Sequence, residues 1–305
     1  MAYAEGTEES VIRAASLARC ESIADPILVG KHDEIKAKAK AIDISLEGIE
    51  IIDPSTDERL DSYAEEYSSL QPQSKNAKEA CAQDNIFSCM MLRRGDVDGM
   101  ICGVGRFFPK MVRPIFNLIG LKDEVRTASG LYVVSLKGRR FFFADTALNT
   151  EMDSKKLASV AISAANFAKS MDITPRVAML SYSNFGSVEH SSVETVRHAT
   201  ELVKKWDPEL EIDGEMAADT AVVEEILSEN YPFSKLKKAA NVLVFPDMQS
   251  GNISYKLLQK LSDAKTIGPI ILGLERPAYV MPRHTDSDEI FNMTTVAVAQ
   301  AKLSS

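Results

Sequence analysis

The amino-acid sequence predicts an α/β protein whose sheets are mainly parallel and covered by helices on both faces. Short apolar runs alternate with amphipathic helical segments along most of the chain, as expected of strands that are connected through helices. Two of these runs, at residues 26–29 and 177–180, are apolar throughout, which is typical of strands buried on both faces. The chain has 305 residues, a length that allows two domains.

The first part of the chain shows this alternation from its start. Residues 1–6 look like the end of a strand, and a helix follows with Val11, Ile12, Ala15 and Leu17 on its apolar side. A chain that begins in this way fits a piece cut from a longer polypeptide, and it equally fits a natural start with a short edge strand. The next elements are a strand at 26–29, a helix at 32–41, a strand at 49–52, a helix at 57–67, a loop or frayed helix start at 69–76, a helix at 78–94, a strand at 98–103 and a helix at 109–119.

The second part begins with a hairpin. Apolar runs at 131–136 and 140–143 flank Lys137-Gly138-Arg139, which is typical of two antiparallel strands joined by a tight turn. The α/β alternation then resumes with a helix at 154–170, a strand at 177–180, a helix after residue 191, a strand at Ile212, a helix near 220–228, a strand at 241–245, a helix at 252–261, strands at 270–272 and 279–281, and a helix at 286–302.

A loop of small polar residues follows the strand at 177–180. It contains Ser183, Asn184, Gly186 and Ser187, residue types that let a backbone turn sharply and point its N–H groups outward. Residues 191–194 have a capping-box pattern, and the apolar side of the following helix is predicted to contain Val193, Val196, Ala199, Val203 and Trp206. A strand, a Ser/Gly loop and a helix N-terminus in succession can hold an anion, although an ordinary structural turn explains the same residues.

The composition narrows the class of function. A net charge of −9 argues against a nucleic-acid-binding surface, and no apolar run approaches the ~20 residues that a membrane span needs. Nothing at the N-terminus resembles a signal peptide, so we expect a cytoplasmic location with no membrane partner. The histidines are scattered, so no metal site is expected. The four cysteines lack metal-ligand spacing and are predicted to be reduced core thiols: Cys20, Cys81, Cys89 and Cys102.

Many short sequence blocks occur in an order that points to one family. In the second part these are Ala178-Met-Leu-Ser-Tyr-Ser183 with Gly186-Ser187, Glu211-Ile-Asp-Gly-Glu215 with Asp219, Ala240-Asn-Val-Leu-Val-Phe-Pro-Asp247, Ser250-Gly-Asn-Ile253, Tyr255-Lys256, Ile267-Gly-Pro269, Gly273-Leu274 and Pro277. Earlier blocks are Ile27-Leu-Val-Gly30, Asp98-Gly99, Arg113-Pro114 and Phe143-Ala-Asp145. With these blocks the chain closely resembles the phosphate acetyltransferase/phosphate butyryltransferase family over nearly its whole length.

The resemblance implies an architecture and a chemistry. The family has two α/β/α three-layer domains with an interdomain cleft, which suggests residues 1–123 plus 272–305 for domain I and 124–271 for domain II. Family members usually form homodimers through domain II. Active members transfer an acetyl group between phosphate and the thiol of coenzyme A.

The N-terminal blocks narrow the resemblance further. Tyr3-Ala-Glu-Gly6 and Val11-Ile-Arg-Ala-Ala15 look like the C-terminal, phosphate-acetyltransferase-like portion of hybrid NADP-dependent malic enzymes. In those hybrids the appended domain is regarded as a sensor of acetyl-CoA. The resemblance therefore implies acetyl-CoA as the ligand and an upstream malic enzyme domain as a partner. NADP and a divalent metal are expected only in that upstream domain, and no cofactor is expected in this segment.

The family's catalytic groups are only partly present. Arg113-Pro114 matches an Arg-Pro step of the family, whereas the family's Ser-Arg pair appears as Pro282-Arg283, and Glu289 stands where Asp is expected. Proline lacks the hydroxyl and the N–H, and losing one such donor can cost ~10²–10³ in rate. Glutamate shifts the carboxylate, and a ~1 Å misplacement can cost ~10²-fold. A further family arginine expected near Leu70 is missing.

We therefore expect binding without catalysis. The predicted acetyl-CoA-binding residues are Arg113, Arg283, Ser183, Asn184, Gly186, Ser187, Lys110, His284 and Thr285. Structural explanations stay open for several of them. Arg113 and Lys110 fit solvated charges, and the segment from His284 to Asp286 fits a cap of the last helix. Glu289 fits a first-turn acid, and Asp213, Glu215 and Asp219 fit turn acids as well as catalytic ones.

The sequence thus predicts an acetyl-CoA-binding regulatory domain of a hybrid NADP-dependent malic enzyme, without phosphotransacetylase activity. An active phosphate acetyltransferase and a pure assembly module are the alternatives.

Overall fold

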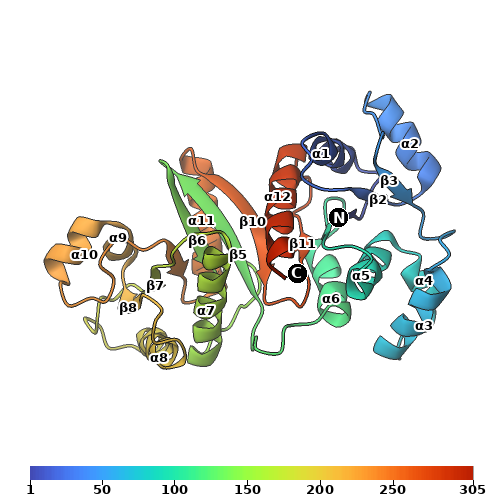
Figure 1. The fold of residues 1–305 in the computed structure, drawn as a ribbon. Coiled ribbons are helices and arrows are strands. Elements are labelled where there is room, and N and C mark those ends of the chain that lie inside the picture. Colours follow the sequence, from blue (N-terminus) through green and yellow to red (C-terminus); the bar gives the residue numbers. More distant parts are fainter. Residues whose placement is uncertain (305) are drawn as a thin grey trace. The chain divides into compact units, whose positions relative to one another are not determined.

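The computed structural model describes residues 1–304, with side chains as far as residue 301. The chain forms two compact units, each built around its own sheet (Figure 1). Unit 1 contains Met1–Lys122 and the chain from Leu274 onward, and unit 2 contains Asp123–Gly273. One sheet is entirely parallel and the other is mixed, so the predicted α/β class is confirmed.

The sheet of unit 1 has five short parallel strands in the order β11-β4-β1-β2-β3. In chain order they are β1 (Ala2–Tyr3), β2 (Ile27–Val29), β3 (Glu50–Ile52), β4 (Met100–Cys102) and β11 (Ala278–Val280). The first strand of the chain lies at the centre, and the last strand lies at an edge. Because all five run in one direction, their carboxyl ends meet along one edge of the sheet, where parallel sheets place their ligands.

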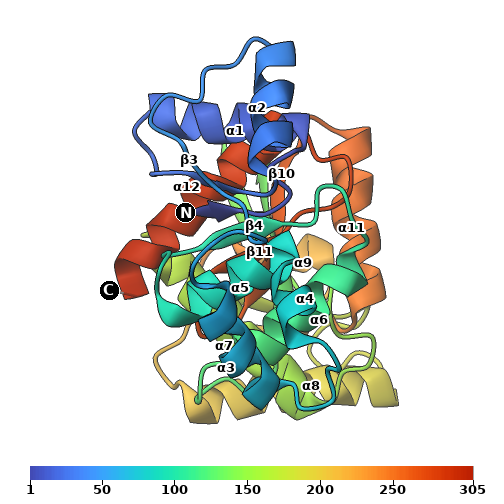
Figure 2. The ribbon, with the colours of Figure 1, turned by 90° about the vertical axis from the view of Figure 1, so that its right-hand side faces the viewer.

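Helices cover both faces of this sheet (Figure 2). One face carries α1 (Glu9–Cys20), α2 (His32–Ala41) and α12 (Ser287–Ser304). The other face carries α5 (Asp84–Arg94) and α6 (Phe108–Leu118), against which α3 (Leu60–Leu70) and α4 (Ala77–Cys81) pack. The hydroxyl groups of Tyr3 and Thr294 share a hydrogen bond of 2.9 Å, which joins the first strand to the last helix inside the core.

Three predictions for unit 1 are corrected by the structure. The single helix expected at 78–94 is two helices, because the chain is extended at Gln83 between α4 and α5. Leu17 was assigned to the apolar side of α1 but is exposed, and Ala14 and Ala18 are buried there instead. Cys20 is exposed at the end of the same helix, whereas the other three cysteines are buried, and all four are free.

The sheet of unit 2 has six strands in the order β10-β5-β6-β9-β7-β8. In chain order they are β5 (Ser129–Leu136), β6 (Arg139–Ala144), β7 (Val177–Leu180), β8 (Ile212–Met216), β9 (Val242–Val244) and β10 (Lys265–Leu272). The pairs β10–β5 and β5–β6 are antiparallel and the others are parallel. The predicted hairpin is confirmed: Lys137 and Gly138 both have positive φ, as a two-residue hairpin turn requires.

Helices α7 (Ser154–Ser170) and α8 (Ser191–Trp206) cover one face of the second sheet. The other face carries α9 (Ala218–Val222), α10 (Glu224–Asn230) and α11 (Met248–Leu261) over an aromatic-rich core in which Tyr132 stacks on Tyr255 at 3.9 Å. The helix expected near 220–228 is therefore two helices, separated at Val223. Trp206, predicted to be buried, is 40% exposed and lies under the Arg126 guanidinium.

Among the residues that the structure describes, no helix is long and apolar enough to cross a membrane.

Candidate functional site

At the carboxyl edge of the unit 1 sheet, the loops that follow β4 and β11 lie side by side. The Met281 amide donates to the Cys102 carbonyl at 2.7 Å, and the His284 amide donates to the Val104 carbonyl at 3.1 Å. This approach requires glycine at position 103. Gly103 has a φ of +102°, and a Cβ atom there would lie 2.6 Å from the Met281 carbonyl oxygen. The two loops are thus locked together by main-chain contacts.

These loops present a group of cationic side chains. The Arg283 guanidinium carbon lies 4.1 Å from the ring centroid of Phe107, which is 56% exposed at the start of α6. Lys110 and Arg113 are exposed on the first turns of the same helix. In the described part of unit 1, no carboxylate is paired with any of these three cations. We call Phe107, Lys110, Arg113 and Arg283 the cationic surface of unit 1.

The segment after Arg283 forms the cap of the last helix. The Asp286 carboxylate accepts a hydrogen bond from the Glu289 amide at 2.8 Å, so Asp286 caps α12. The buried Thr285 hydroxyl donates to the Pro282 carbonyl at 2.6 Å, which leaves it a local structural role. His284 has a φ of +63° at the bend of the loop. Pro282 and Glu289 are both exposed, so the two positions that depart from the family pattern face solvent.

A buried carboxylate that was not predicted lies beneath this loop. Glu5, two residues after the end of β1, is 4% exposed and accepts hydrogen bonds from the amides of Gly103 at 2.6 Å and Gly105 at 3.2 Å. Arg106 reaches from Glu5, at 3.8 Å, to Asp84 at the start of α5, at 2.7 Å. Burial raises the pKa of the Glu5 carboxyl, and the Gly103 amide and the Arg106 guanidinium offset only part of this effect.

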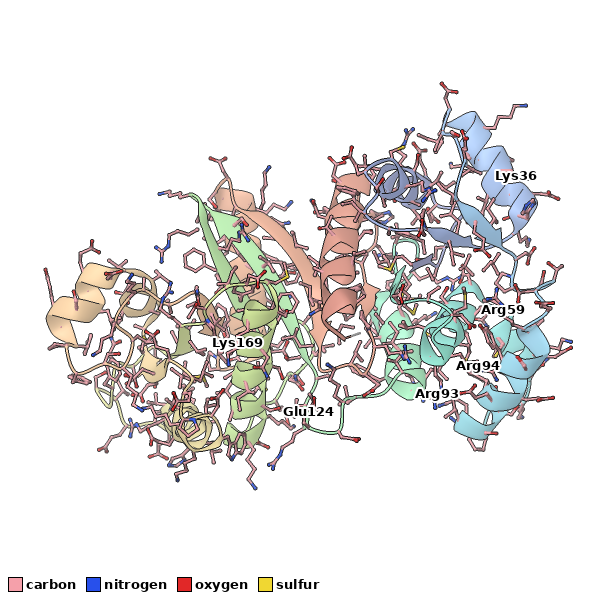
Figure 3. All side chains as sticks on the ribbon, in the orientation of Figure 1. Lys36, Arg59, Arg93, Arg94, Glu124 and Lys169 are labelled. Atoms are coloured by element: carbon pink, nitrogen blue, oxygen red, sulfur yellow. The ribbon has the colours of Figure 1, made fainter. Side chains whose placement is uncertain are left out.

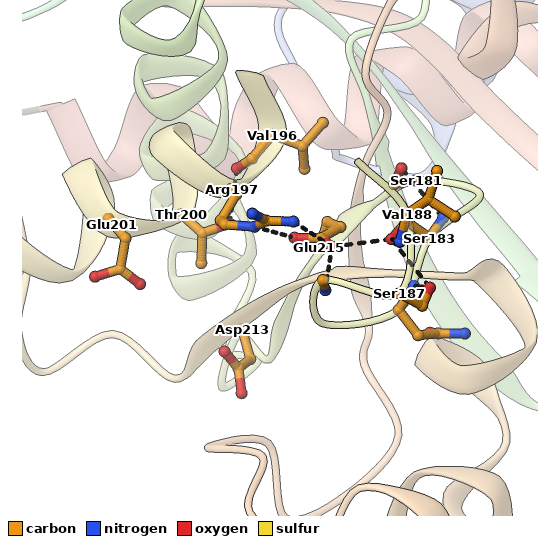
Figure 4. Close-up of polar contacts among 12 residues, drawn as sticks. Ser181, Ser183, Ser187, Val188, Val196, Arg197, Thr200, Glu201, Asp213 and Glu215 are labelled. Carbon is orange, nitrogen blue, oxygen red and sulfur yellow. Dashed lines mark hydrogen bonds and ion pairs between the residues drawn. The ribbon is translucent and has the colours of Figure 1, made fainter. Parts of the chain in front are cut away.

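In unit 2, the loop after β7 is organised around another buried carboxylate (Figure 4). Glu215, at the end of the neighbouring strand β8, accepts hydrogen bonds from the Ser183 hydroxyl at 3.0 Å and the Gly186 amide at 2.7 Å. Arg197 on α8 pairs with the same carboxylate at 3.2 Å. Burial alone would raise the pKa of Glu215, but Arg197 and the loop donors hold that pKa below its usual value.

The other residues of this loop are also bonded inside the unit. The Ser187 hydroxyl accepts from the Asn184 amide at 3.0 Å, and the Asn184 side-chain oxygen accepts from the Ala217 amide at 2.8 Å. The expectation that the loop points its N–H groups outward is wrong for Gly186, whose N–H donates to Glu215, and for Ser183, whose N–H donates to the Ser181 hydroxyl at 3.3 Å. A contact between this loop and acetyl-CoA stays a prediction.

The predicted site residues thus fall into two groups. Lys110, Arg113, Arg283, His284 and Thr285 lie near the carboxyl edge of the unit 1 sheet, and the four loop residues from Ser183 to Ser187 lie together in unit 2. The acids Asp213 and Asp219 do not join the second group. Asp213 accepts from Ser234 at 2.9 Å and Lys204 at 3.1 Å, and the Asp219 carboxylate accepts from the adjacent Thr220 amide at 2.9 Å.

Sequence reasoning missed Glu5, Phe107 and Arg197. An acidic residue that directly follows an apolar strand start, as in Tyr3-Ala-Glu-Gly6, is a signal that could have identified Glu5. Nothing in the sequence pairs Phe107 with Arg283 or Arg197 with Glu215, because each pair joins distant segments.

Unit 1 also contains a cavity of about 300 Å³ that includes none of the predicted residues; it is lined by Glu66, Arg93, Ile119, Glu275 and Arg276. Arg93 and Arg94 lie at the end of α5, where Figure 3 labels them, and both donate to Glu66 at 2.7 Å, so the arginine that lines the cavity is held in place. No group of three or more metal-ligating side chains occurs among the described residues.

Comparison with known proteins identifies the family. The sequence profile described as phosphate acetyl/butaryl transferase matches residues 1–298. Phosphate acetyltransferase of Bacillus subtilis is 35% identical over 98% of this chain and 94% of its own length. NADP-dependent malic enzyme of Escherichia coli is 34% identical over 98% of this chain but only 40% of its own length. A phosphotransacetylase structure from Streptococcus pyogenes superposes with a TM-score of 0.93 at 32% identity, covering 99% of this chain and 94% of that one. The chain therefore belongs to the phosphate acetyl/butaryl transferase family.

Proposed function

We propose that this protein is a phosphate acetyltransferase that moves an acetyl group between phosphate and the thiol of coenzyme A. The observation that carries the proposal is the extent of the similarity, which takes in 98% of this chain and 94% of the Bacillus subtilis phosphate acetyltransferase. The cationic surface of unit 1 supports it. Arg113 and Arg283 are exposed and free of carboxylate partners within that unit, and arginine binds phosphate through paired hydrogen bonds.

The proposed reaction assigns a role to three exposed groups. In the direction of acetyl-CoA formation, a carboxylate removes the thiol proton of coenzyme A, and Glu289 in the first turn of α12 is the candidate. The thiolate attacks the carbonyl carbon of acetyl phosphate, and the negative charge on the tetrahedral oxygen is stabilised by Arg283 and Arg113. The bond between the carbonyl carbon and the phosphate oxygen then breaks, which releases phosphate and leaves acetyl-CoA.

A second candidate function is acetyl-CoA sensing without turnover, in a protein that also contains a malic enzyme domain. Pro282 favours it, because this residue offers neither a hydroxyl nor an N–H beside Arg283, where the family pattern has serine. The similarity to the Escherichia coli malic enzyme is consistent with it. In this case a coupling of ~1–3 kcal/mol between sites would be sufficient for regulation.

The homodimer expected through unit 2 also stays a proposal. Its support is an apolar stripe on α11, where Ile253, Leu257 and Leu261 are 58%, 52% and 81% exposed at i, i+4 and i+8. A second copy of this helix offers the same stripe in return, as a two-fold interface requires.

One experiment separates the candidates. The purified protein is supplied with acetyl phosphate and coenzyme A, and thioester formation is followed, while titration calorimetry measures acetyl-CoA binding. Turnover that Arg283→Ala abolishes supports the transferase. Binding without turnover supports the sensor. The absence of both refutes both proposals and leaves only an assembly role.

A further inference from the structure

The buried carboxylate of Glu5 is bonded to the loop that carries the cationic surface of unit 1. One oxygen accepts from the Gly103 amide at 2.6 Å, and the other accepts from the Gly105 amide at 3.2 Å. The two donors are two residues apart in the loop between β4 and α6. Because the two amides bond different oxygens of the side chain, a glutamine would place its NH2 group against one of these donors, so a carboxylate fits this position better than an amide.

Three further contacts hold the same loop. Arg106 bonds Asp84 and Asn85 at the start of α5, at 2.7 and 2.9 Å. On the opposite side, the loop's Val104 carbonyl accepts from the His284 amide at 3.1 Å. The loop is therefore fixed at once to β1, to α5 and to the segment that contains Arg283.

The loop ends at Phe107, and this ring is the surface on which Arg283 lies. The guanidinium carbon is 4.1 Å from the ring centroid, and no carboxylate of the described part of unit 1 holds Arg283 in place. Glu5 is thus connected to Arg283 through Gly103, Gly105 and Phe107. A displacement of the loop would move the ring and, with it, the guanidinium.

We propose that Glu5 is a positioning residue: its carboxylate fixes the loop of residues 103–107 and thereby sets the orientation of Arg283 toward the bound anion. The inference rests on the proposed function, because it requires that Arg283 contacts the phosphate or thioester ligand. Glu5 itself touches neither.

The environment of Glu5 supports this role over a purely structural one. A buried carboxylate loses its hydration, and the cation that faces it among the described residues, Arg106, is 3.8 Å away and 40% exposed. Burial raises the pKa of Glu5, which means that the folded state disfavours its charge. The carboxylate is bonded to the amides of Gly103 and Gly105, so its effect is on the loop that it holds.

The test compares Glu5→Gln with a matched control, Glu9→Gln. Glu9 is also an acid near the start of the chain, but its side chain is 46% exposed and pairs with Arg13 and Lys38 on helix surfaces. Because a misoriented Arg283 loses a charge-assisted hydrogen bond to the anion, we expect Glu5→Gln to weaken acetyl phosphate and acetyl-CoA binding by roughly tenfold. Its thermal midpoint should stay within a few degrees of the wild-type value, and Glu9→Gln should change neither quantity.

A double-mutant cycle with Phe107→Leu tests the route of the effect. If Glu5 acts through the ring, the losses of affinity in the two single variants will not add in the double variant. Additive losses would overturn the inference. Phe107 is exposed, so Phe107→Leu is expected to fold. If Glu5→Gln fails to fold, the affinity of Phe107→Leu alone tests the inference. Unchanged affinity in Phe107→Leu would then overturn the inference.

The outcomes distinguish this inference from the proposed function. Wild-type protein that binds neither acetyl phosphate nor acetyl-CoA refutes the proposed function and the inference together. Wild-type protein that binds them, with equal affinity in Glu5→Gln, refutes only the inference. A loss of affinity accompanied by a matching loss of thermal stability assigns Glu5 to the fold and also refutes it.

Discussion

Replacing Arg283 by alanine tests the cationic surface of unit 1 directly. The variant removes an exposed guanidinium that lies 4.1 Å from the Phe107 ring centroid and makes no ion pair within the described part of its unit. If Arg283 binds the phosphate or thioester ligand, the substitution removes at least one charge-assisted hydrogen bond. Such a bond contributes ~1.5–3 kcal/mol, which corresponds to a rise in Kd of roughly tenfold or more.

The effect on stability is expected to be much smaller than the effect on binding. An exposed cation–π contact contributes about 0.5–1 kcal/mol, and the thermal midpoint should therefore fall by only a few degrees. Arg139→Ala is the matched control. Arg139 is also exposed and lies over an aromatic ring, that of Phe141 at 4.7 Å, but it belongs to the hairpin of unit 2 and has no predicted ligand role.

Titration calorimetry with acetyl-CoA and a thermal melt of each variant measure both quantities. We expect a large loss of affinity with Arg283→Ala, an intermediate loss with Arg283→Lys because lysine keeps the charge without the planar fork, and no loss with Arg139→Ala. Equal affinities in Arg283→Ala and the wild-type protein would remove Arg283 from the site. Equal losses in the two alanine variants would show that the effect is not specific.

Three further predictions concern the fold and the assembly. Replacing Glu215 by alanine removes the acceptor of the buried Ser183 hydroxyl, of the Gly186 amide and of Arg197, so the free energy of unfolding at neutral pH should fall by ~1–3 kcal/mol in denaturant titrations. Because the pKa of Glu215 is held below its usual value, its stabilising effect is present at neutral pH and is lost as the pH falls through the folded pKa. If Glu215→Ala and the wild-type protein lose stability equally as the pH is lowered, this reasoning is contradicted. Gly103→Ala should lower the free energy of unfolding by several kcal/mol, because its Cβ would clash with the Met281 carbonyl. Gly138→Ala is the control: Gly138 also has positive φ but has open space around it, so the substitution should cost only ~1 kcal/mol. Similar thermal midpoints for the two variants would refute the steric argument. Leu257→Glu should shift the sedimentation of the protein from dimer to monomer without lowering its thermal midpoint, and a dimer that persists would exclude α11 as the interface.

The elements that the sequence predicted well have local causes. The hairpin at Lys137 and Gly138 follows from turn chemistry, and the helix at 154–170 follows from its apolar period and from Asp153, whose side chain caps it. The first five residues of β10 were missed because Gly268 and Pro269 interrupt the strand pattern. In the fold this pair sits at a register shift between Ile267 and Ile270, where a proline without an N–H is tolerated.

The candidate site was predictable only in part. Arg113 and Arg283 were found because they stand in recognisable sequence blocks, and the Asp286 cap was among the options that local spacing allows. The carboxylates that organise the two loops were not assigned their roles. The partners of Glu5 lie about a hundred residues away in the chain, and Arg197 reaches Glu215 only after α8 has packed on β8. Such pairings are products of tertiary structure, which local sequence patterns do not encode.

Unit 1 is built from two separate segments of the chain, and this has a consequence for its folding during synthesis on the ribosome. The edge of β4 stays uncovered until β11, which pairs Ala278 with Met100, has been translated. All of unit 2 is translated between these two strands. Because unit 2 is one continuous segment, it is complete before the sheet of unit 1 can receive its last strand. Until β11 is translated, the nascent amino-terminal segment therefore exposes an unpaired strand edge, which can pair with other chains. We expect the protein to depend on chaperones mainly during the translation of unit 2.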